Sequence, residues 1–260
     1  ENDELDRDKK YLIKVISPKV DINRFYNTDS EYKIINDLVD LSKPDKSVST
    51  IFIWPEGMLT STYLKDIHYY KDLFQLNFSN KHIIILGIND VEKNNNLKIY
   101  NSLVVVDNNL NVLNYYHKNN LVPFGEFLPM ENFLKKIGLK TITNNYQSFS
   151  KGKERKIISI KNKNFDLSFL PLICYEIIYS GNIKKTNNFD IIINISEDGW
   201  FGNSIGPHQH FAHSIFRAVE EGKNIIRSTN NGISALVGPK GNIITKNEST
   251  ESGVLEIRNL

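Results

Sequence analysis

The single cysteine of this 260-residue chain ends a run of apolar residues, and this feature constrains the fold more than any other. The run extends over 165–173 and predicts a buried strand, because a short continuous apolar segment suits a strand covered on both faces. Cys174 follows directly. In α/β proteins, reactive groups gather where strands end at the carboxyl edge of the sheet, so this position suits a nucleophile. Free cysteine is also among the most buried residue types, and packing in a core is the alternative.

The composition excludes several classes of protein. Lysine and arginine number 32 against 30 aspartate and glutamate, so the formal net charge is only +2. This balance argues against a nucleic-acid partner. No apolar run approaches the roughly 18 residues that a membrane-spanning helix needs, and no signal-peptide pattern occurs. A lone cysteine excludes an intramolecular disulfide. The charged residues 1–10 predict a leader or linker, which leaves 11–260 as one domain.

Segments typical of strands outnumber those typical of helices. Apolar residues at helical spacing predict helices over 30–41, 63–78 and 207–221, with Ser30 as a helix cap and Pro207 in a first turn. Because helices recur between strands, we expect a layered α/β fold. Strands are expected over 11–16, 48–54, 82–88, 102–106, 112–116, 156–160, 165–173, 190–195, 225–228, 233–237, 242–245 and 253–257.

Residues 127–150 combine apolar side chains with lysines and predict a short amphipathic segment. Such a segment could turn an apolar side toward solvent or a membrane surface. An ordinary helix packed on the core is the alternative.

Two charged side chains near strand ends are candidates for chemistry. Glu56 follows the predicted strand 48–54, where partial desolvation would raise its pKa and suit a general base; the alternative is an acid that caps a helix. Lys118 follows the strand 112–116 and could stabilise an oxyanion or a neighbouring thiolate; the alternative is a solvated loop lysine. Glu126, in the same Pro/Gly-containing loop, is a second acid or a loop charge.

Two other patterns do not support a site. Residues 202–206 match G-x-S-x-G, but no strand directly precedes Ser204 and no acid followed by a histidine lies downstream. His208, His210 and His213 lack a carboxylate or thiol at ligand spacing, so we expect structural roles and no metal. No Walker loop and no G-x-G-x-x-G occur, which leaves a nucleotide site unsupported.

Taken together, the acid in 54–56, the lysine in 116–127 and the cysteine in 173–178 resemble the carbon–nitrogen hydrolase (nitrilase) superfamily. The flanking residues resemble one branch of it, the apolipoprotein N-acyltransferases, over nearly the whole chain from about residue 11. The motifs that carry this narrower resemblance are Asn120-Leu121-Val122-Pro123-Phe124-Gly125-Glu126-Phe127, Ile173-Cys174-Tyr175-Glu176-Ile177-Ile178, Asp198-Gly199-Trp200-Phe201-Gly202 and Arg227-Ser228-Thr229-Asn230-Asn231-Gly232-Ile233.

The resemblance implies a four-layer αββα sandwich and a set of residue roles. Glu56 would be the general base, Lys118 the oxyanion partner and Cys174 the nucleophile. It implies neither a metal nor a cofactor. Supporting roles would fall to Glu126, Tyr175 and Glu176, and substrate contacts to Phe25, Phe127 and Trp200. This sequence departs from the family in having Phe25 or Tyr26 where tryptophan is expected, and Gly199 where alanine is common.

The resemblance also implies a reaction and a place in the cell. A fatty acyl chain would pass from a phospholipid to Cys174 as a thioester, and then to the N-terminal amine of a diacylglyceryl apolipoprotein. The 127–150 segment would act as a lid that contacts lipid. The family's membrane-spanning helices are missing from this sequence, and they would hold the domain on the periplasmic side of the bacterial inner membrane. The alternatives are an amidase or nitrilase with a small C–N substrate, and a non-catalytic binding domain on the same scaffold.

Overall fold

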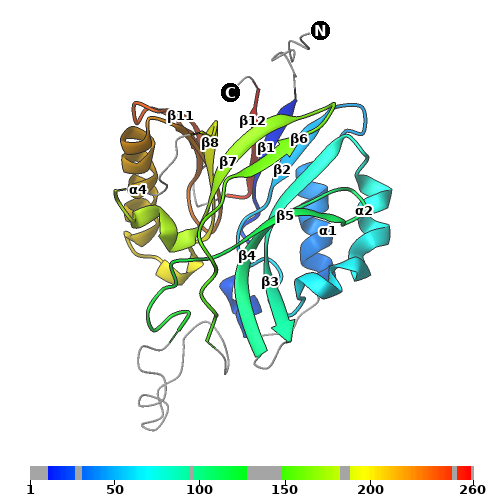
Figure 1. Cartoon of the computed structure of the whole chain (residues 1–260), viewed down its shortest axis with the longest axis horizontal. Helices are drawn as coiled ribbons and strands as arrows, with labels where there is room; N and C mark the ends of the chain where they lie inside the picture. Colours follow the sequence, from blue (N-terminus) through cyan, green and yellow to red (C-terminus); the bar gives the residue numbers. More distant parts are fainter. Residues whose placement is uncertain are drawn as a thin grey trace.

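Two six-stranded sheets pack against each other at the centre of the molecule (Figure 1). The computed structural model describes residues 11–26, 31–93, 97–127, 148–181, 188–247 and 251–258. The expected leader 1–10, the expected cap Ser30 and most of the expected lid, 128–147, lie outside the described residues. Those three expectations therefore stay predictions.

The first sheet joins the two ends of the described chain. Its β1, β2 and β3 strands run parallel, while its other neighbouring strands pair antiparallel. Its order is β12 (Gly253–Ile257), β1 (Leu12–Ser17), β2 (Thr50–Ile53), β3 (His82–Lys93), β4 (Leu97–Val106) and β5 (Val112–His117).

The second sheet repeats this mixed pattern. Its β7, β8 and β9 strands run parallel, and its edges pair antiparallel. Its order is β11 (Ile243–Asn247), β10 (Ser234–Val237), β9 (Asn224–Asn230), β8 (Ile191–Glu197), β7 (Asp166–Ile173) and β6 (Ile158–Lys161).

Helices cover the outer faces of both sheets, so the chain forms the expected αββα sandwich (Figure 1). On the first sheet, Ile51 and Ile53 enter the core between the sheets, whereas Phe52 points outward to α1 (Glu31–Ser42) and α2 (Lys71–Asn77). This alternation follows from the two-residue repeat of a strand. On the second sheet, α4 (Gly206–Glu221) covers the outer face. Strands buried on both faces explain the continuous apolar runs in the sequence.

Two elements differ from the expected ones. The helix expected over 63–78 is a 3-10 helix, η2 (Leu64–Tyr70), followed by α2. Its apolar residues Leu64, Ile67 and Tyr70 are three apart, which matches the three-residue turn of a 3-10 helix. The strands β3 and β4 extend past the expected ends into a long hairpin, where Asp90 pairs with Tyr100 and Glu92 with Lys98. Polar residues dominate this extension, so it lacked an apolar signal.

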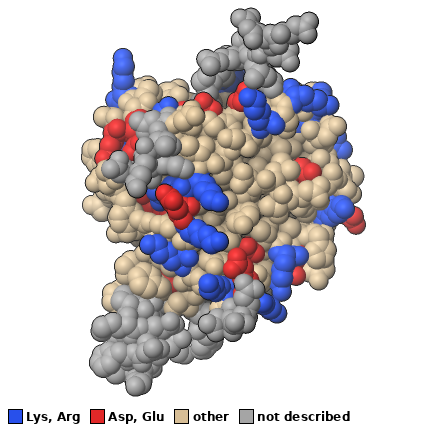
Figure 2. Space-filling view, viewed as in Figure 1, with Lys and Arg blue, Asp and Glu red and all other residues tan. Residues whose placement is uncertain are grey.

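The described surface carries both signs of charge. Lysine and arginine side chains are interspersed with aspartate and glutamate over the face seen in Figure 2. Within the described ranges, no helix combines the length and hydropathy needed to cross a bilayer.

Candidate active site

Glu56, Lys118 and Cys174 all lie just beyond the carboxyl ends of strands, as the sequence predicted. Glu56 follows β2 in the turn Trp54-Pro55-Glu56-Gly57, and Lys118 follows β5 of the same sheet. Cys174 follows β7 of the second sheet and begins the 3-10 helix η4 (Cys174–Ile178). The sandwich therefore brings the three segments together from both of its sheets.

Lys118 lies between two carboxylates. Its Nζ is 3.7 Å from Glu56 Oε1 and donates a 2.9 Å hydrogen bond to Glu126 Oε1. Asn101 on β4 donates its side-chain amide to both acids, at 2.6 Å to Glu56 and 2.9 Å to Glu126. The backbone N–H of Glu197 donates to the other oxygen of Glu56 at 3.1 Å. All four of these side chains are buried, so the group forms a rigid charged cluster.

The charges of this cluster suit a base next to a fixed cation. Burial and the Glu126 carboxylate raise the pKa of Glu56, against the opposing effects of Lys118, Asn101 and the Glu197 N–H. Burial would lower the pKa of Lys118, but the Glu126 and Glu56 carboxylates outweigh it and hold that pKa above its ordinary value. Lys118 is therefore a permanent cation, while Glu56 binds a proton more readily than a solvated glutamate.

The Cys174 thiol lies within the field of both groups. Burial and the Glu56 carboxylate raise its pKa, whereas Lys118 and the Ser196 side chain lower it. The net direction is upward, so the resting thiol is protonated and needs a base to become a nucleophile. The residue remains partly exposed. Its backbone has a φ of +50°, a left-handed conformation that side chains rarely adopt and that costs about 1–3 kcal/mol.

Glu176 joins the cysteine turn to the lysine loop. It is fully buried, and its Oε2 accepts the N–H of Ile173 at 2.9 Å. Its Oε1 is held by four donors from the lysine side of the site, namely Tyr116 Oη at 2.7 Å and, each at 3.0 Å, Asn119 N, Asn120 N and Arg155 Nη2. The carboxylate thus fixes the two loops relative to each other.

Of the three residues expected to contact substrate, Phe25 and Trp200 contact each other, and Phe127 lies on a different loop. Phe25, in the 3-10 helix η1 (Ile22–Phe25), stacks at a tilt on Trp200 of η5 (Gly199–Phe201) with ring centroids 4.7 Å apart. Phe127 directly follows Glu126 and accepts the Phe124 N–H at 2.8 Å through its carbonyl. Tyr175 follows Cys174 in the chain and packs edge-on against Tyr179, with ring centroids 5.9 Å apart.

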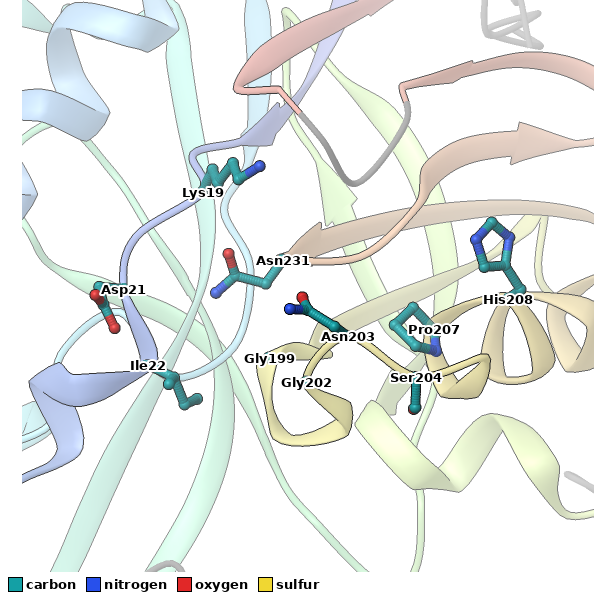
Figure 3. A pocket seen from close by; sticks show the side chains of 10 residues that line it. All are labelled: Lys19, Asp21, Ile22, Gly199, Gly202, Asn203, Ser204, Pro207, His208 and Asn231. Atoms are coloured by element: carbon teal, nitrogen blue, oxygen red, sulfur yellow. The ribbon is translucent and has the colours of Figure 1, made fainter.

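The histidines of α4 occupy different surroundings. His210 is buried, and its Nδ1 is 2.8 Å from Asp198 Oδ1. His208 is exposed and lines a cavity of about 520 Å³ between the segment after β1 and the η5–α4 connection, together with Lys19 and Asn203 (Figure 3). Neither Glu56 nor Cys174 lines this cavity. Among the described residues there is no cluster of three or more histidine, cysteine or acidic ligands for a metal ion.

Sequence reasoning missed several residues that shape the site. Asn101 lies one position before the strand expected over 102–106, and a polar amide at the edge of an apolar run was its only signal. Tyr116 lay within the lysine segment 116–127 but, like Arg155, had no assigned role, since their shared partner Glu176 is 60 and 21 residues away along the chain.

The sandwich thus brings a buried acid, a lysine and a cysteine together at its strand ends, an arrangement typical of sites in which a thiol is the nucleophile. The sequence profile of the carbon–nitrogen hydrolase family matches residues 45–258, and the chain belongs to this family. Among solved structures, an amidase from Nesterenkonia sp. has a TM-score of 0.66 at 13% identity, covering 98% of this chain and 92% of its own. A CN-hydrolase superfamily protein from Xanthomonas campestris has a TM-score of 0.64 at 12% identity, with 96% and 90% covered. At these identities the likeness shows the fold alone.

Curated relatives narrow the resemblance. An apolipoprotein N-acyltransferase of Wigglesworthia glossinidia brevipalpis is 34% identical over 92% of this chain and 48% of its own length. Those of Rickettsia prowazekii and Vibrio vulnificus are 43% and 32% identical over 68% and 95% of this chain. The resemblance expected from the sequence motifs is thereby confirmed. The chain spans only 35–49% of the length of these three relatives.

Proposed function

We propose that Cys174 is a nucleophile, Glu56 its general base and Lys118 the cation that stabilises the tetrahedral oxyanion. The observation that carries this proposal is the position of Lys118, whose Nζ is within 3.7 Å of Glu56 while its charge acts on the Cys174 thiol. A buried carboxylate with a raised pKa accepts a thiol proton more readily than a solvated one. Glu126 and Asn101 hold the lysine and the base in place.

The reaction that fits both the site and the relatives is acyl transfer. Glu56 takes the thiol proton, and the thiolate attacks the ester carbonyl of a phospholipid. Lys118 and a backbone N–H near Tyr175 hold the oxyanion. The C–O bond breaks, the lysophospholipid leaves with the proton from Glu56, and a thioester remains on Cys174. The N-terminal amine of a diacylglyceryl apolipoprotein then attacks, Glu56 accepts its proton, and the amide product leaves as the thiol re-forms.

The name of the relatives, apolipoprotein N-acyltransferase, supports an apolipoprotein amine as the acceptor. Because these relatives are about twice as long or more, this domain is proposed to be part of a larger protein. We assign residues 11–260 as the catalytic domain of an apolipoprotein N-acyltransferase that acts on the periplasmic side of the bacterial inner membrane. Phospholipid would be the donor, and membrane-spanning segments elsewhere in the protein would bring the site to it. Phe25 and Trp200, paired beside the loops of the site, are assigned as contacts for the acyl chain because their rings offer apolar area.

The test uses full-length protein with phospholipid vesicles and a diacylglyceryl lipopeptide. We expect an N-acylated lipopeptide from the native protein and none from Cys174→Ala. A Ser204→Ala variant is the matched control, and it should keep native activity. Hydrolysis of a small amide without any transfer from phospholipid would favour the amidase alternative. A Cys174→Ala variant with native product yield would contradict the proposed function.

A further inference from the structure

The backbone carbonyl of Cys174 is held by side chains from two other elements. His210 Nε2, on α4, is 3.3 Å from this oxygen, and Asn194 Nδ2, on β8, is 3.5 Å from it. Asn194 also donates to the carbonyl of Leu172, at 3.2 Å. Because Cys174 has a φ of +50°, its conformation persists only where its surroundings determine it. These two contacts are therefore candidates for what holds the nucleophile in place.

His210 is itself anchored by a buried ionic network. Its Nδ1 is 2.8 Å from Asp198 Oδ1, and Arg227 Nη2 on β9 donates to both oxygens of Asp198, at 3.0 and 2.8 Å. Arg227 also donates through Nη1 to Asn194 Oδ1, so both contacts to the Cys174 carbonyl share one anchor. Asp198, Asn194 and Arg227 are fully buried, and His210 nearly so.

The network around Asp198 also extends to the side chain of Cys174. Ser196 on β8 donates to Asp198 Oδ1 at 2.8 Å, and its side chain lies beside the Cys174 thiol and lowers the pKa of that thiol. Asp198 thus connects to residue 174 by two routes, one through His210 to the carbonyl and one through Ser196 to the thiol. The ion pair with Arg227 holds the pKa of Asp198 at about 2 in spite of its burial, so this anchor stays charged.

The chemistry of the ring fits a donor to the carbonyl. Nε2 must carry a proton to donate to the Cys174 oxygen, and Nδ1 must carry one to donate to Asp198 Oδ1, so the imidazolium is the form that makes both hydrogen bonds. Burial and Arg227 lower the pKa of His210, against Asp198 and the Cys174 carbonyl, which favour the imidazolium. A carbonyl fixed at residue 174 also fixes the peptide plane that carries the N–H of Tyr175, which is the oxyanion donor proposed above.

We propose that His210, anchored by Asp198 and Arg227, is a positioning residue that fixes the Cys174 carbonyl and thereby aims the adjacent peptide N–H at the oxyanion. This inference rests on the proposed nucleophilic role of Cys174. It assigns a function to Asp198 and Arg227, which belong to the motifs 198–202 and 227–233 that indicated the family. A positioning defect should slow attack on a carbonyl, which needs an oxyanion site, far more than alkylation, which does not.

The experiment compares His210→Leu and His210→Gln in full-length protein, with His213→Gln on the same helix as control. Two rates are measured by mass spectrometry, namely acylation of Cys174 by phospholipid and its alkylation by iodoacetamide, and thermal unfolding is followed in parallel. We expect His210→Leu to acylate at least about tenfold more slowly while alkylation changes by less than about threefold. His210→Gln keeps an N–H donor of similar reach and should recover most of the loss.

Three results would overturn the inference. These are native acylation in His210→Leu, equal loss of acylation and alkylation in a folded His210→Leu variant, and a folded His210→Gln variant that acylates at least about tenfold more slowly than the native protein. The last result decides the matter even if His210→Leu does not fold. If the native protein is not acylated by phospholipid, the proposed function fails instead, and p-nitrophenyl acetate then replaces phospholipid as the acyl donor in the same comparison.

Discussion

Replacing Asn101 by leucine should weaken the site and the fold by a predictable amount. The Asn101 amide donates to Glu56 at 2.6 Å and to Glu126 at 2.9 Å, and leucine keeps a similar volume without a donor. A hydrogen bond to a charged group contributes about 1.5–3 kcal/mol. Because Lys118 still stabilises both carboxylates in the variant, we take the lower value of about 1.5 kcal/mol for each of the two hydrogen bonds. Their loss should lower the free energy of unfolding by about 3 kcal/mol at neutral pH.

The same change should shift the pH dependence of acylation. The Asn101 hydrogen bond lowers the pKa of Glu56, so its removal raises that pKa further. A loss of about 1.5 kcal/mol on the ionised form corresponds to roughly one pKa unit. Because Glu56 must be ionised to act as a base, the acid limb of the acylation rate should move up by about one pH unit.

The stability difference should also depend on pH in a defined direction. A carboxyl whose folded pKa is raised favours the folded state at low pH, and this contribution is lost as pH rises through the folded pKa. The difference in the free energy of unfolding between the native protein and Asn101→Leu should therefore increase from acidic to neutral pH. Urea unfolding and an acylation profile measure both effects, with Asn114→Leu on the edge strand β5 as control, expected within about 0.5 kcal/mol. An unchanged acid limb in a folded Asn101→Leu variant would refute the reasoning.

Three further changes test other parts of the site. Lys118→Met removes the cation between Glu56 and Glu126 and should slow acylation about 100-fold or more, measured by adduct formation; a smaller loss than tenfold would contradict an oxyanion role. Glu176→Gln removes the buried carboxylate that pairs with the half-buried Arg155 and should lower the free energy of unfolding by about 3 kcal/mol, measured with urea; a change below about 1 kcal/mol would not fit. Arg24→Leu strips the ion pair from buried Glu197, whose pKa is already raised by burial, so its destabilisation should grow from pH 5 to pH 8; a pH-independent loss would argue against this account.

Local patterns in the sequence were sufficient for the positions of the three central residues. Glu56 and Cys174 each follow an apolar run that is buried on both faces, so the end of the run marks the carboxyl edge of a sheet. Lys118 follows the edge strand β5, which is mostly exposed, and its position came from the end of that strand and from the family resemblance. The same runs indicated the layered fold, and the motifs around Cys174 and Lys118 indicated the family. The αββα arrangement itself came from the family resemblance, because apolar runs do not state which strands pair.

Contacts between distant segments could not be predicted in this way. Nothing in the sequence of β12 indicates that it pairs with β1 at the other end of the chain. The links from Asn101 to Glu56 and from His210 to the Cys174 carbonyl span 45 and 36 residues and involve side chains with many possible partners. His210 was expected to be structural, and its contact with the nucleophile became visible only once α4 was placed against η4.

The most direct test of the central claim is to locate the acyl group on the protein. Full-length native protein is incubated with phospholipid, digested, and the peptide containing Cys174 is examined by mass spectrometry before and after hydroxylamine. The account predicts one acyl group on Cys174, released by hydroxylamine and missing from Glu56→Gln. An acyl group on another residue, or native labelling of Cys174 in the Glu56→Gln variant, would contradict it.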